Sequence, residues 1–435
     1  MVSGAPTDGV NSNTFVERLK VQLQNLHQRS CPEIINPSCK KRASVALIVR
    51  IRPKFDDTPG QSEANSISAP KDFDGDLDSF FRQDWVQRGE PEVLFIKRAA
   101  RNGDRWTGHI ALPGGQRDPS DLGDQHTSVR ETMEEVGLDL TADNVLLIGT
   151  LPQRTVATVF HSVPLMELCA FVYLITSPSL PPLRLQPSEI AAAHWVSFRA
   201  MLIPSHRTYE SCDISDRLRV RGDWLIRYAT RAVLGQMLYP AISLIPYESL
   251  YSSPATSLPS QEDFPAGTFS TIKSKVTRLL FPSHFTSGIT RKPLLLWGLT
   301  HGIVTDFLGL LPPYRTLELW TWPTFTYWDV RFILWLTTFR FRYRKLHSVA
   351  AGSAIPMIAA EGLVAPSISR NEETASEKRE DYRPGMQATP QFSCIGHLLD
   401  GYFQLTKRAV VIILATRLAF GLALAGLTFN RSRNK

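Results

Sequence analysis

Residues 112–138 read LPGGQRDPSDLGDQHTSVRETMEEVGL, and this stretch says more about the chain than any other. A Gly-Gly turn leads through an acidic loop into a predicted helix, which Gly137 closes. Within the helix, Glu131, Glu134 and Glu135 are spaced three and four residues apart, so they share one face. Carboxylates crowded on one face repel each other, and a hard divalent cation such as Mg²⁺ offsets that repulsion. The pattern therefore predicts a cation-binding helix beside a glycine turn.

The stretch resembles the Nudix hydrolase signature, in which Gly, five residues, Glu and seven residues precede REUxEExGU, where U is aliphatic. Gly115 takes the first position, and residues 130–138 match the second half. The loop departs from this pattern, because Asp121 stands where the pattern has Glu, and eight residues rather than seven then precede Arg130. Thr132 also replaces an aliphatic residue. The same insertion and Asp occur in the coenzyme A diphosphatase branch, so the departures indicate that branch of the family.

The resemblance implies a divalent-cation site built mainly on the helix. Its ligands would be the carboxylates of Glu131, Glu134 and Glu135 and the main-chain carbonyl of Gly114. Arg130 would hold these carboxylates in place as a neighbouring cation. The expected cofactor is Mg²⁺ or Mn²⁺, which would neutralise charge on a diphosphate while water attacks it.

Further residues receive roles from the same resemblance. The expected phosphate contacts are the turn and one basic side chain: Gly114, Gly115 and Arg98. Glycines there let the backbone approach a phosphate with no Cβ in the way. Asp121 is expected to order the turn rather than to bind metal. The general base is either Glu131 or Glu189, because several family members use a carboxylate from outside the helix.

Flanking segments extend the resemblance. Residues 93–96 (VLFI) and 108–112 (GHIAL) are typical of short strands, and GHIALPGG is similar to the lead-in of coenzyme A diphosphatases. Residues 104–107 (DRWT) depart from the stricter coenzyme A pattern, which leaves the acyl carrier open as substrate. Residues 189–198 resemble a late acidic position followed by a Trp-bearing strand. Residues 294–308 (LLLWGLTHGIVTDFL) resemble the closing helix of the branch, with an ordinary core helix as the alternative.

The expected fold is an α/β/α Nudix sandwich around a mixed β-sheet, with an internal insertion and a helical C-terminal extension. Three further strands are expected at residues 44–51, 144–150 and 168–175. The chain divides into seven expected segments: a polar leader (1–42), the first part of the core (43–201), an insertion (202–289), the closing helix (290–312), an aromatic and basic helical segment (313–350), a flexible linker (351–395) and a candidate membrane-associated helix (396–435).

Composition narrows the location and the partners. The 435 residues carry a net charge of +7, and the five cysteines are dispersed without a CxxC pair, which argues against structural zinc and for a reducing compartment. A basic chain suits a phosphate-rich substrate, anionic lipid or nucleic acid. Nucleic acid is not expected as a partner, because the catalytic stretch lacks an aromatic and basic stripe. The first thirty residues lack a signal-peptide core, although residues 15–29 form a candidate amphipathic helix.

The C-terminal region raises the question of a membrane. Residues 409–429 contain one charge, Arg417, and are long enough to span a bilayer. If this helix packs on the protein instead, Arg417 should be paired or exposed. Residues 320–343 mix Trp, Phe, Tyr and Arg, which favours either an interfacial segment or an aromatic cluster on the core. The expected location is intracellular, with C-terminal anchoring to an organelle membrane facing the cytosol as one alternative and a mitochondrial or peroxisomal location left open.

The expected activity is divalent-cation-dependent hydrolysis of a diphosphate bond in a nucleoside diphosphate linked to another moiety, with coenzyme A or an acyl-coenzyme A as first candidate. The alternatives are hydrolysis of ADP-ribose, dinucleotides or an RNA cap. A third alternative is a catalytically silent, membrane-associated module that binds a nucleotide. Such silent modules usually lack one of the glutamates, and all three are present here. The sequence leaves the oligomeric state undetermined.

Overall fold

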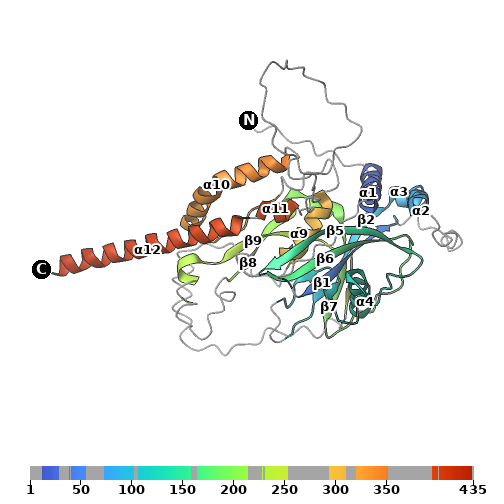
Figure 1. Ribbon diagram of the computed structural model, residues 1–435, viewed down its shortest axis with the longest axis horizontal. Coiled ribbons are helices and arrows are strands. Elements are labelled where there is room, and N and C mark those ends of the chain that lie inside the picture. The colour runs from blue at the N-terminus through green and yellow to red at the C-terminus, as the bar shows by residue number, and fades with distance from the viewer. Residues whose placement is uncertain are drawn as a thin grey trace, which may run out of the picture.

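A mixed β-sheet forms the centre of the protein, and helices cover both of its faces (Figure 1). The computed structural model describes residues 12–28, 39, 41–54, 73–101, 106–157, 164–213, 228, 231–252, 293–309, 320–350, 394–399 and 401–433. The strands, in order across the sheet, are β10 (Glu248–Tyr251), β7 (Ile190–Ser197), β2 (Glu90–Arg98), β1 (Arg42–Arg52), β6 (Pro164–Ile175) and β5 (Val145–Ala157). The short strands β3 (Ile110–Ala111) and β4 (Gly114–Gln116) pair with β2 and β1.

Strand β1 occupies the middle of this sheet because its side chains are apolar on both faces. Leu47 and Val49 point into the core on one side, and Ala46 and Ile48 point into the core on the other. β1 pairs in parallel with β6, and the other described strand pairs are antiparallel. This mixed sheet between two helical layers confirms the expected fold.

Helices are divided unequally between the two faces. One face is covered by α4 (Asp124–Val136). The other face carries α1 (Ser12–His27), α2 (Phe73–Phe81), α3 (Asp84–Arg88), α5 (Phe198–Leu202) and α9 (Gly298–Gly309). The larger hydrophobic core lies under this second group of helices.

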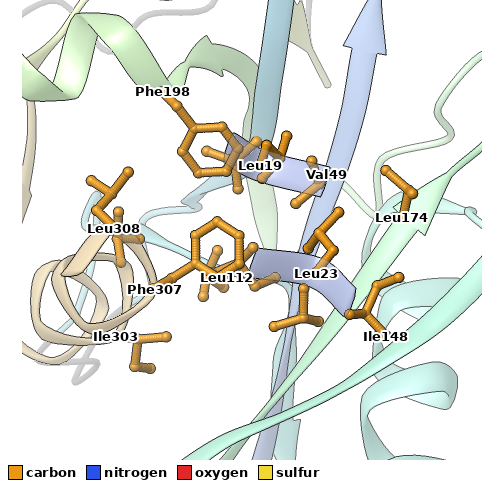
Figure 2. Packing of buried hydrophobic residues seen from close by; sticks show 14 of the residues in the cluster. Leu19, Leu23, Val49, Leu112, Ile148, Leu174, Phe198, Ile303, Phe307 and Leu308 are labelled. Atoms are coloured by element: carbon orange, nitrogen blue, oxygen red, sulfur yellow. The ribbon is translucent and has the colours of Figure 1, made fainter. Parts of the chain in front are cut away.

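Helix α1 belongs to this core, although its residues fall in the segment expected as a polar leader. Figure 2 shows Leu19 and Leu23 of α1 beside Val49 and Leu174 of the sheet, with Phe307 of α9 next to them. The apolar side chains of α1 recur every three or four residues, so one stripe is buried while the polar residues face outward. The structure thus confirms the amphipathic helix expected at residues 15–29 and adds that its apolar face belongs to the core of the sheet.

A second, smaller sheet extends the core beside α9. It consists of β9 (Met237–Leu244) with β8 (Arg207–Cys212), β11 (Leu294–Trp297) and β12 (Thr324–Phe325). Between β7 and β8 lies the short 3-10 helix η3 (Pro204–His206). Three strands of the expected insertion are therefore integral to the two sheets, since β10 pairs with β7 and β9 contributes Ile242 and Leu244 to the core.

The expected closing helix needs a correction at its start. Residues 294–297 form β11, and the helix α9 begins only at Gly298, where φ is +66°. Leu296 of β11 pairs with Ile242 of β9, and both are buried. A short apolar run can form either a strand or a helix. Here residues 294–297 form a strand because β9 lies beside them and pairs with them.

The C-terminal region forms three helices: α10 (Trp328–Ala350), α11 (Cys394–Leu399) and α12 (Tyr402–Arg433). α10 and α12 lie side by side, and α12 then projects away from the rest of the protein (Figure 1). Arg417 donates to Asp329 at 2.5 Å, so the charge in the apolar segment is paired. Within the described residues, no helix combines the length and apolarity needed to cross a bilayer. Most of the expected linker lies outside the described residues.

Candidate active site

The site is organised around α4 and the glycine turn before it. α4 ends at Gly137, whose φ of +68° places it in the left-handed region, and its N–H donates to the Met133 carbonyl at 3.0 Å. A Cβ at this position would also lie 2.8 Å from Cβ of Arg184. Both facts explain why glycine closes the helix.

The glycine turn is pressed against β1 on one side and α4 on the other. Gly114 pairs with Val45, and Gly115 pairs with Ser44. A Cβ on Gly114 would overlap the β1 backbone, and a Cβ on Gly115 would overlap the carboxylate of Glu131. The absence of both side chains lets a helix carboxylate lie directly against the turn.

Glu135 is the most deeply placed carboxylate of the site. Its residue is 2% exposed, and its Oε2 accepts a hydrogen bond from the Gly114 N–H at 2.9 Å. Burial raises the pKa of Glu135 to about 8, and the charges of Glu131 and Glu189 push it in the same direction. The Gly114 hydrogen bond and the charge of Arg98 oppose that rise in pKa. A negative charge at this position therefore lacks enough positive charge around it.

The other carboxylates surround Glu135 at different depths. Burial also raises the pKa of Glu131, although the Arg130 guanidinium lies 3.1 Å from its Oε1. Glu134 is more accessible, with a side chain 58% exposed, and it pairs with Arg130 at 3.0 Å. Glu189 comes directly before β7, and its charge contributes to the raised pKa values of Glu131 and Glu135. The structure thus brings all four sequence-predicted carboxylates into one cluster.

Asp121 and Arg130 form the anchor of the loop. The Arg130 guanidinium donates through Nε and Nη2 to the two carboxylate oxygens of Asp121, each at 2.9 Å. Asp121 also accepts from the Asp118 N–H and the Thr127 hydroxyl, and Nδ1 of His126 lies 3.0 Å from it. The hydrogen bonds from Arg130, ahead of the others, hold the pKa of Asp121 far below its usual range. These contacts suit a residue that orders the turn.

Thr132 accounts for one departure from the Nudix pattern. It is fully buried, and its hydroxyl donates to the Ser128 carbonyl at 2.7 Å, which satisfies the polar atom within the helix. Ser128 in turn shares a 2.8 Å hydrogen bond with the hydroxyl of Tyr173 on β6. The threonine methyl therefore occupies an aliphatic position while the helix stays hydrogen-bonded to the sheet.

The fit of this site to a divalent cation rests on its donor chemistry. Within the described part of the chain, no three His, Cys, Asp or Glu side chains converge as a ready-made metal group. The reason is visible in the contacts, because Glu134 turns to Arg130 and Glu135 to the Gly114 amide. The oxygen donors nevertheless suit a hard cation, since Glu131 and Glu135 both carry raised pKa values that added positive charge would lower.

Sequence reasoning missed the residue that holds Glu189. Arg101 donates to the Glu189 carboxylate at 2.8 Å and to the Ser188 carbonyl at 2.9 Å. The backbone bond from Ala99 N–H to the Glu189 carbonyl brings the two loops together. Arg101 lies 88 positions before Glu189, so no local pattern pairs them. Of the expected departure at residues 104–107, only residues 106 and 107 are described.

Comparison with known proteins places this site in a family. The NUDIX domain family matches residues 85–211, which include the glycine turn, α4 and β7. The protein C14C4.10c of Schizosaccharomyces pombe is 31% identical over 327 residues, covering 73% of this chain and 81% of its own. The Nudix hydrolase NudL of Cronobacter sakazakii is 32% identical over 152 residues, covering 34% of this chain and 71% of its own.

A third relative shares a shorter stretch. Mitochondrial coenzyme A diphosphatase NUDT8 of Mus musculus is 41% identical over 58 residues, which cover 13% of this chain and 28% of that protein. The family match contains all four clustered carboxylates together with Arg130 and both turn glycines. The family model covers the site, and the similarity to NudL extends over 71% of that protein. This chain therefore belongs to the Nudix hydrolase family.

Proposed function

We propose that this Nudix hydrolase cleaves the diphosphate bond of a nucleoside diphosphate linked to another moiety, with Mg²⁺ or Mn²⁺ as cofactor and coenzyme A or an acyl-coenzyme A as first candidate substrate. The observation that carries the proposal is Glu135, buried against the Gly114 amide within a carboxylate cluster. Burying a carboxylate beside other carboxylates is costly unless cations enter the site. A bound diphosphate would add further negative charge, so a cation between it and the carboxylates would neutralise both.

The cofactor has a natural place in this arrangement. Glu131, Glu134, Glu135 and the carbonyl of Gly114 would hold Mg²⁺ or Mn²⁺. When bound, the cation supplies neutralisation of the charge that develops on the phosphoryl oxygens. Glu134 would leave Arg130 and turn toward the other carboxylates, and its side chain is 58% exposed.

Neighbouring groups position the substrate. Arg98 is the last residue of β2, its charge opposes the rise in the pKa of Glu135, and it would contact a phosphate oxygen. Gly114 and Gly115 leave room for the diphosphate at the turn, because neither has a Cβ. Arg130 stays bound to Asp121 and holds Glu131 in place through its remaining contact.

The nucleophile is water, and a carboxylate removes its proton. Water attacks one phosphorus atom, and the bond from that phosphorus to the bridging oxygen breaks. The products are a nucleoside monophosphate and a phosphorylated remainder. Glu131 and Glu189 are the two candidate bases, and they differ in their contacts: Glu131 lies against Gly115 and Arg130, whereas Glu189 is held from another loop by Arg101.

Substitution of Glu189 separates these two candidates. If Glu189 is the base, Glu189→Gln lowers kcat by about 10²–10⁴-fold and removes one limb of the pH–rate profile. Arg101→Gln is the matched variant, because it frees the Glu189 carboxylate without removing it. If Glu189→Gln retains both the rate and the profile, Glu131 is the base.

Product analysis tests the substrate. The purified protein is incubated with coenzyme A, an acyl-coenzyme A, ADP-ribose, NADH and capped RNA in the presence of Mg²⁺ or Mn²⁺. The proposal expects 3′,5′-ADP and 4′-phosphopantetheine from coenzyme A. Turnover of ADP-ribose, dinucleotide or cap with coenzyme A untouched would reassign the substrate, and no turnover with any of them would favour a silent binding module. Fractionation of the cells would show whether the enzyme is held in an organelle.

A further inference from the structure

Helix α10 presents an uninterrupted apolar stripe to solvent. Its members recur every three or four residues, so they share one face: Trp328, Phe332, Trp335, Phe339, Tyr343 and Leu346. Three of these rings lie one against the next, with centroids 6.2 Å apart for Phe332 and Trp335 and 5.3 Å apart for Trp335 and Phe339. Trp328 is 80% exposed, and Phe332 is 57% exposed. A continuous exposed stripe of this kind marks a binding surface more often than scattered apolar residues do.

The opposite face of α10 already has its partner within the chain. Val330 and Leu334 are fully buried against Ala409 and Ile413 of α12. The exposed stripe is therefore a second apolar face rather than the core face of a displaced helix. Helix packing accounts for the first face and leaves the stripe unexplained among the described elements.

Helix α12 continues the apolar surface beyond the end of this packing. Past Ile413, five large apolar side chains of α12 are exposed: Leu414, Leu418, Phe420, Leu422 and Leu427. Figure 1 shows this part of α12 projecting from the protein beside α10. Apolar side chains are therefore exposed on both α10 and α12. Exposure of so many apolar side chains to water is unfavourable.

Charge indicates what covers this surface. α10 carries five Arg and Lys residues and one carboxylate, Asp329, which is paired with Arg417. α12 carries five Arg and Lys residues and no carboxylate. Arg340 and Arg344 are exposed beside the stripe, where they and the rings of Phe339 and Tyr343 line a shallow depression. The partner must therefore accept both apolar side chains and an excess of positive charge.

We infer that the α10–α12 surface binds the face of an anionic lipid bilayer, with the helices lying in the plane of the headgroups. Trp and Tyr favour the headgroup level, Phe and Leu reach the acyl boundary, and Arg pairs with lipid phosphate. Single-stranded RNA would also suit Arg beside aromatic rings, but it gives no role to the aliphatic surface of α12. A second copy would bring the same excess positive charge to the contact.

Flotation of the full-length protein with lipid vesicles tests the apolar part. The wild-type protein is expected to float with vesicles containing phosphatidylserine and to remain below with vesicles of phosphatidylcholine alone. The triple variant Phe332→Ser, Trp335→Ser, Phe339→Ser should bind more than about tenfold more weakly, because these side chains supply the buried apolar area. Trp106→Ser is the matched control, since Trp106 is 54% exposed elsewhere and should leave binding unchanged.

A charge-reversal pair tests the electrostatic part. Arg340→Glu with Arg344→Glu should weaken binding to the anionic vesicles by at least about 30-fold, because each basic residue near such a surface contributes about fivefold. Arg82→Glu with Arg88→Glu reverses two exposed charges, in the turn after α2 and at the end of α3, and should have little effect. Thermal unfolding of every variant checks that the fold is kept.

Four outcomes overturn the inference. The wild-type protein fails to float with anionic vesicles, or the control variants lose binding as much as the α10 variants. Binding of single-stranded RNA through the same residues, without vesicle binding, would assign the surface to nucleic acid. A dimer in sedimentation that the triple variant dissociates, again without vesicle binding, would assign it to a second copy. None of these results depends on the proposed hydrolase activity.

Discussion

The α4 site and the α10–α12 pair depart from ordinary burial in opposite directions. Around α4, carboxylates such as Asp121 and Glu135 are buried. On α10 and α12, large apolar side chains such as Trp335 and Leu418 are exposed. Charged groups are rarely buried without partners, and extended apolar patches are rarely left in water. Each departure therefore indicates a partner, and the two partners are of different kinds.

The two regions differ in how far the chain itself supplies partners for its buried charges and its exposed apolar side chains. Asp121 is compensated entirely within the chain, by Arg130 and several neutral donors. Glu135 is compensated only in part, and the deficit fits a cation. The stripe on α10 has no covering element among the described residues, and its surroundings are basic. Asp121, whose charge is fully compensated within the chain, is therefore a structural residue. Glu135, whose charge is compensated only in part, is a candidate metal ligand, and the uncovered stripe on α10 is the proposed docking surface.

Removing ligand charge should have the largest effect on function. Glu134→Gln and Glu135→Gln are each expected to lower kcat by about 10²–10³-fold, since charge that stabilises the transition state through a bound cation is lost. Glu17→Gln, an exposed carboxylate on α1, should leave turnover unchanged. Steady-state kinetics at saturating Mg²⁺ measure the effect. Near-normal rates for both site variants would remove the proposed ligand roles.

Breaking the ion pair between Asp121 and Arg130 should have the largest effect on stability. Asp121→Asn leaves Arg130 without its bidentate partner and should lower the free energy of unfolding by about 3 kcal/mol. Asp118→Asn is the matched control, because its carboxylate is 59% exposed and lies 3.8 Å from the same Arg130. Urea unfolding of both variants gives the comparison. Equal losses would show that burial of the pair does not govern its contribution.

The partial compensation of Glu135 predicts a pH dependence. Because its pKa is raised from 4.5 to about 8, the folded chain binds more protons than the unfolded chain between these pH values. The free energy of unfolding should fall as pH rises through this window, by up to about 1.4 kcal/mol per pH unit. Glu135→Gln should remove most of that slope and leave the part that the raised pKa of Glu131 contributes, whereas Glu134→Gln should largely keep it. The measurement is urea unfolding in EDTA across the window, and parallel slopes for wild type and Glu135→Gln would contradict the prediction.

The smallest effect is expected in the C-terminal pair. Arg417 and Asp329 are both about one-third exposed, so Arg417→Leu should change the free energy of unfolding by less than about 1 kcal/mol. Turnover should not change, because neither residue belongs to the α4 site. Asp329→Asn provides the reciprocal variant. A loss of several kcal/mol in either variant would show that this ion pair, rather than apolar packing, holds α12 against α10.

Much of the site was accessible to sequence reasoning because its signals are local. The spacing of Glu131, Glu134 and Glu135 predicted one helical face, and Gly137 predicted the end of the helix, where the structure shows a left-handed residue. The strand predicted at residues 44–51 is observed as β1 (Arg42–Arg52). Apolar periodicity and turn chemistry act over a few residues, so they can be read without knowing the fold. The expected Nudix family, which was recognised from such local patterns, is also confirmed.

Pairing between distant segments escaped that reasoning. Arg101 and Glu189 come from separate loops, and residues 294–297 became a strand only because β9 lies beside them. The amphipathic helix expected at residues 15–29 is observed as α1, but its segment was assigned to a leader because only the folded sheet supplies the surface on which Leu19 packs. Sequence alone determined the helix, the turn and the chemistry of their side chains, since these follow from local backbone preference. Which charges are compensated, and which apolar face stays exposed, was decided by the tertiary structure, because both depend on groups that meet only after folding.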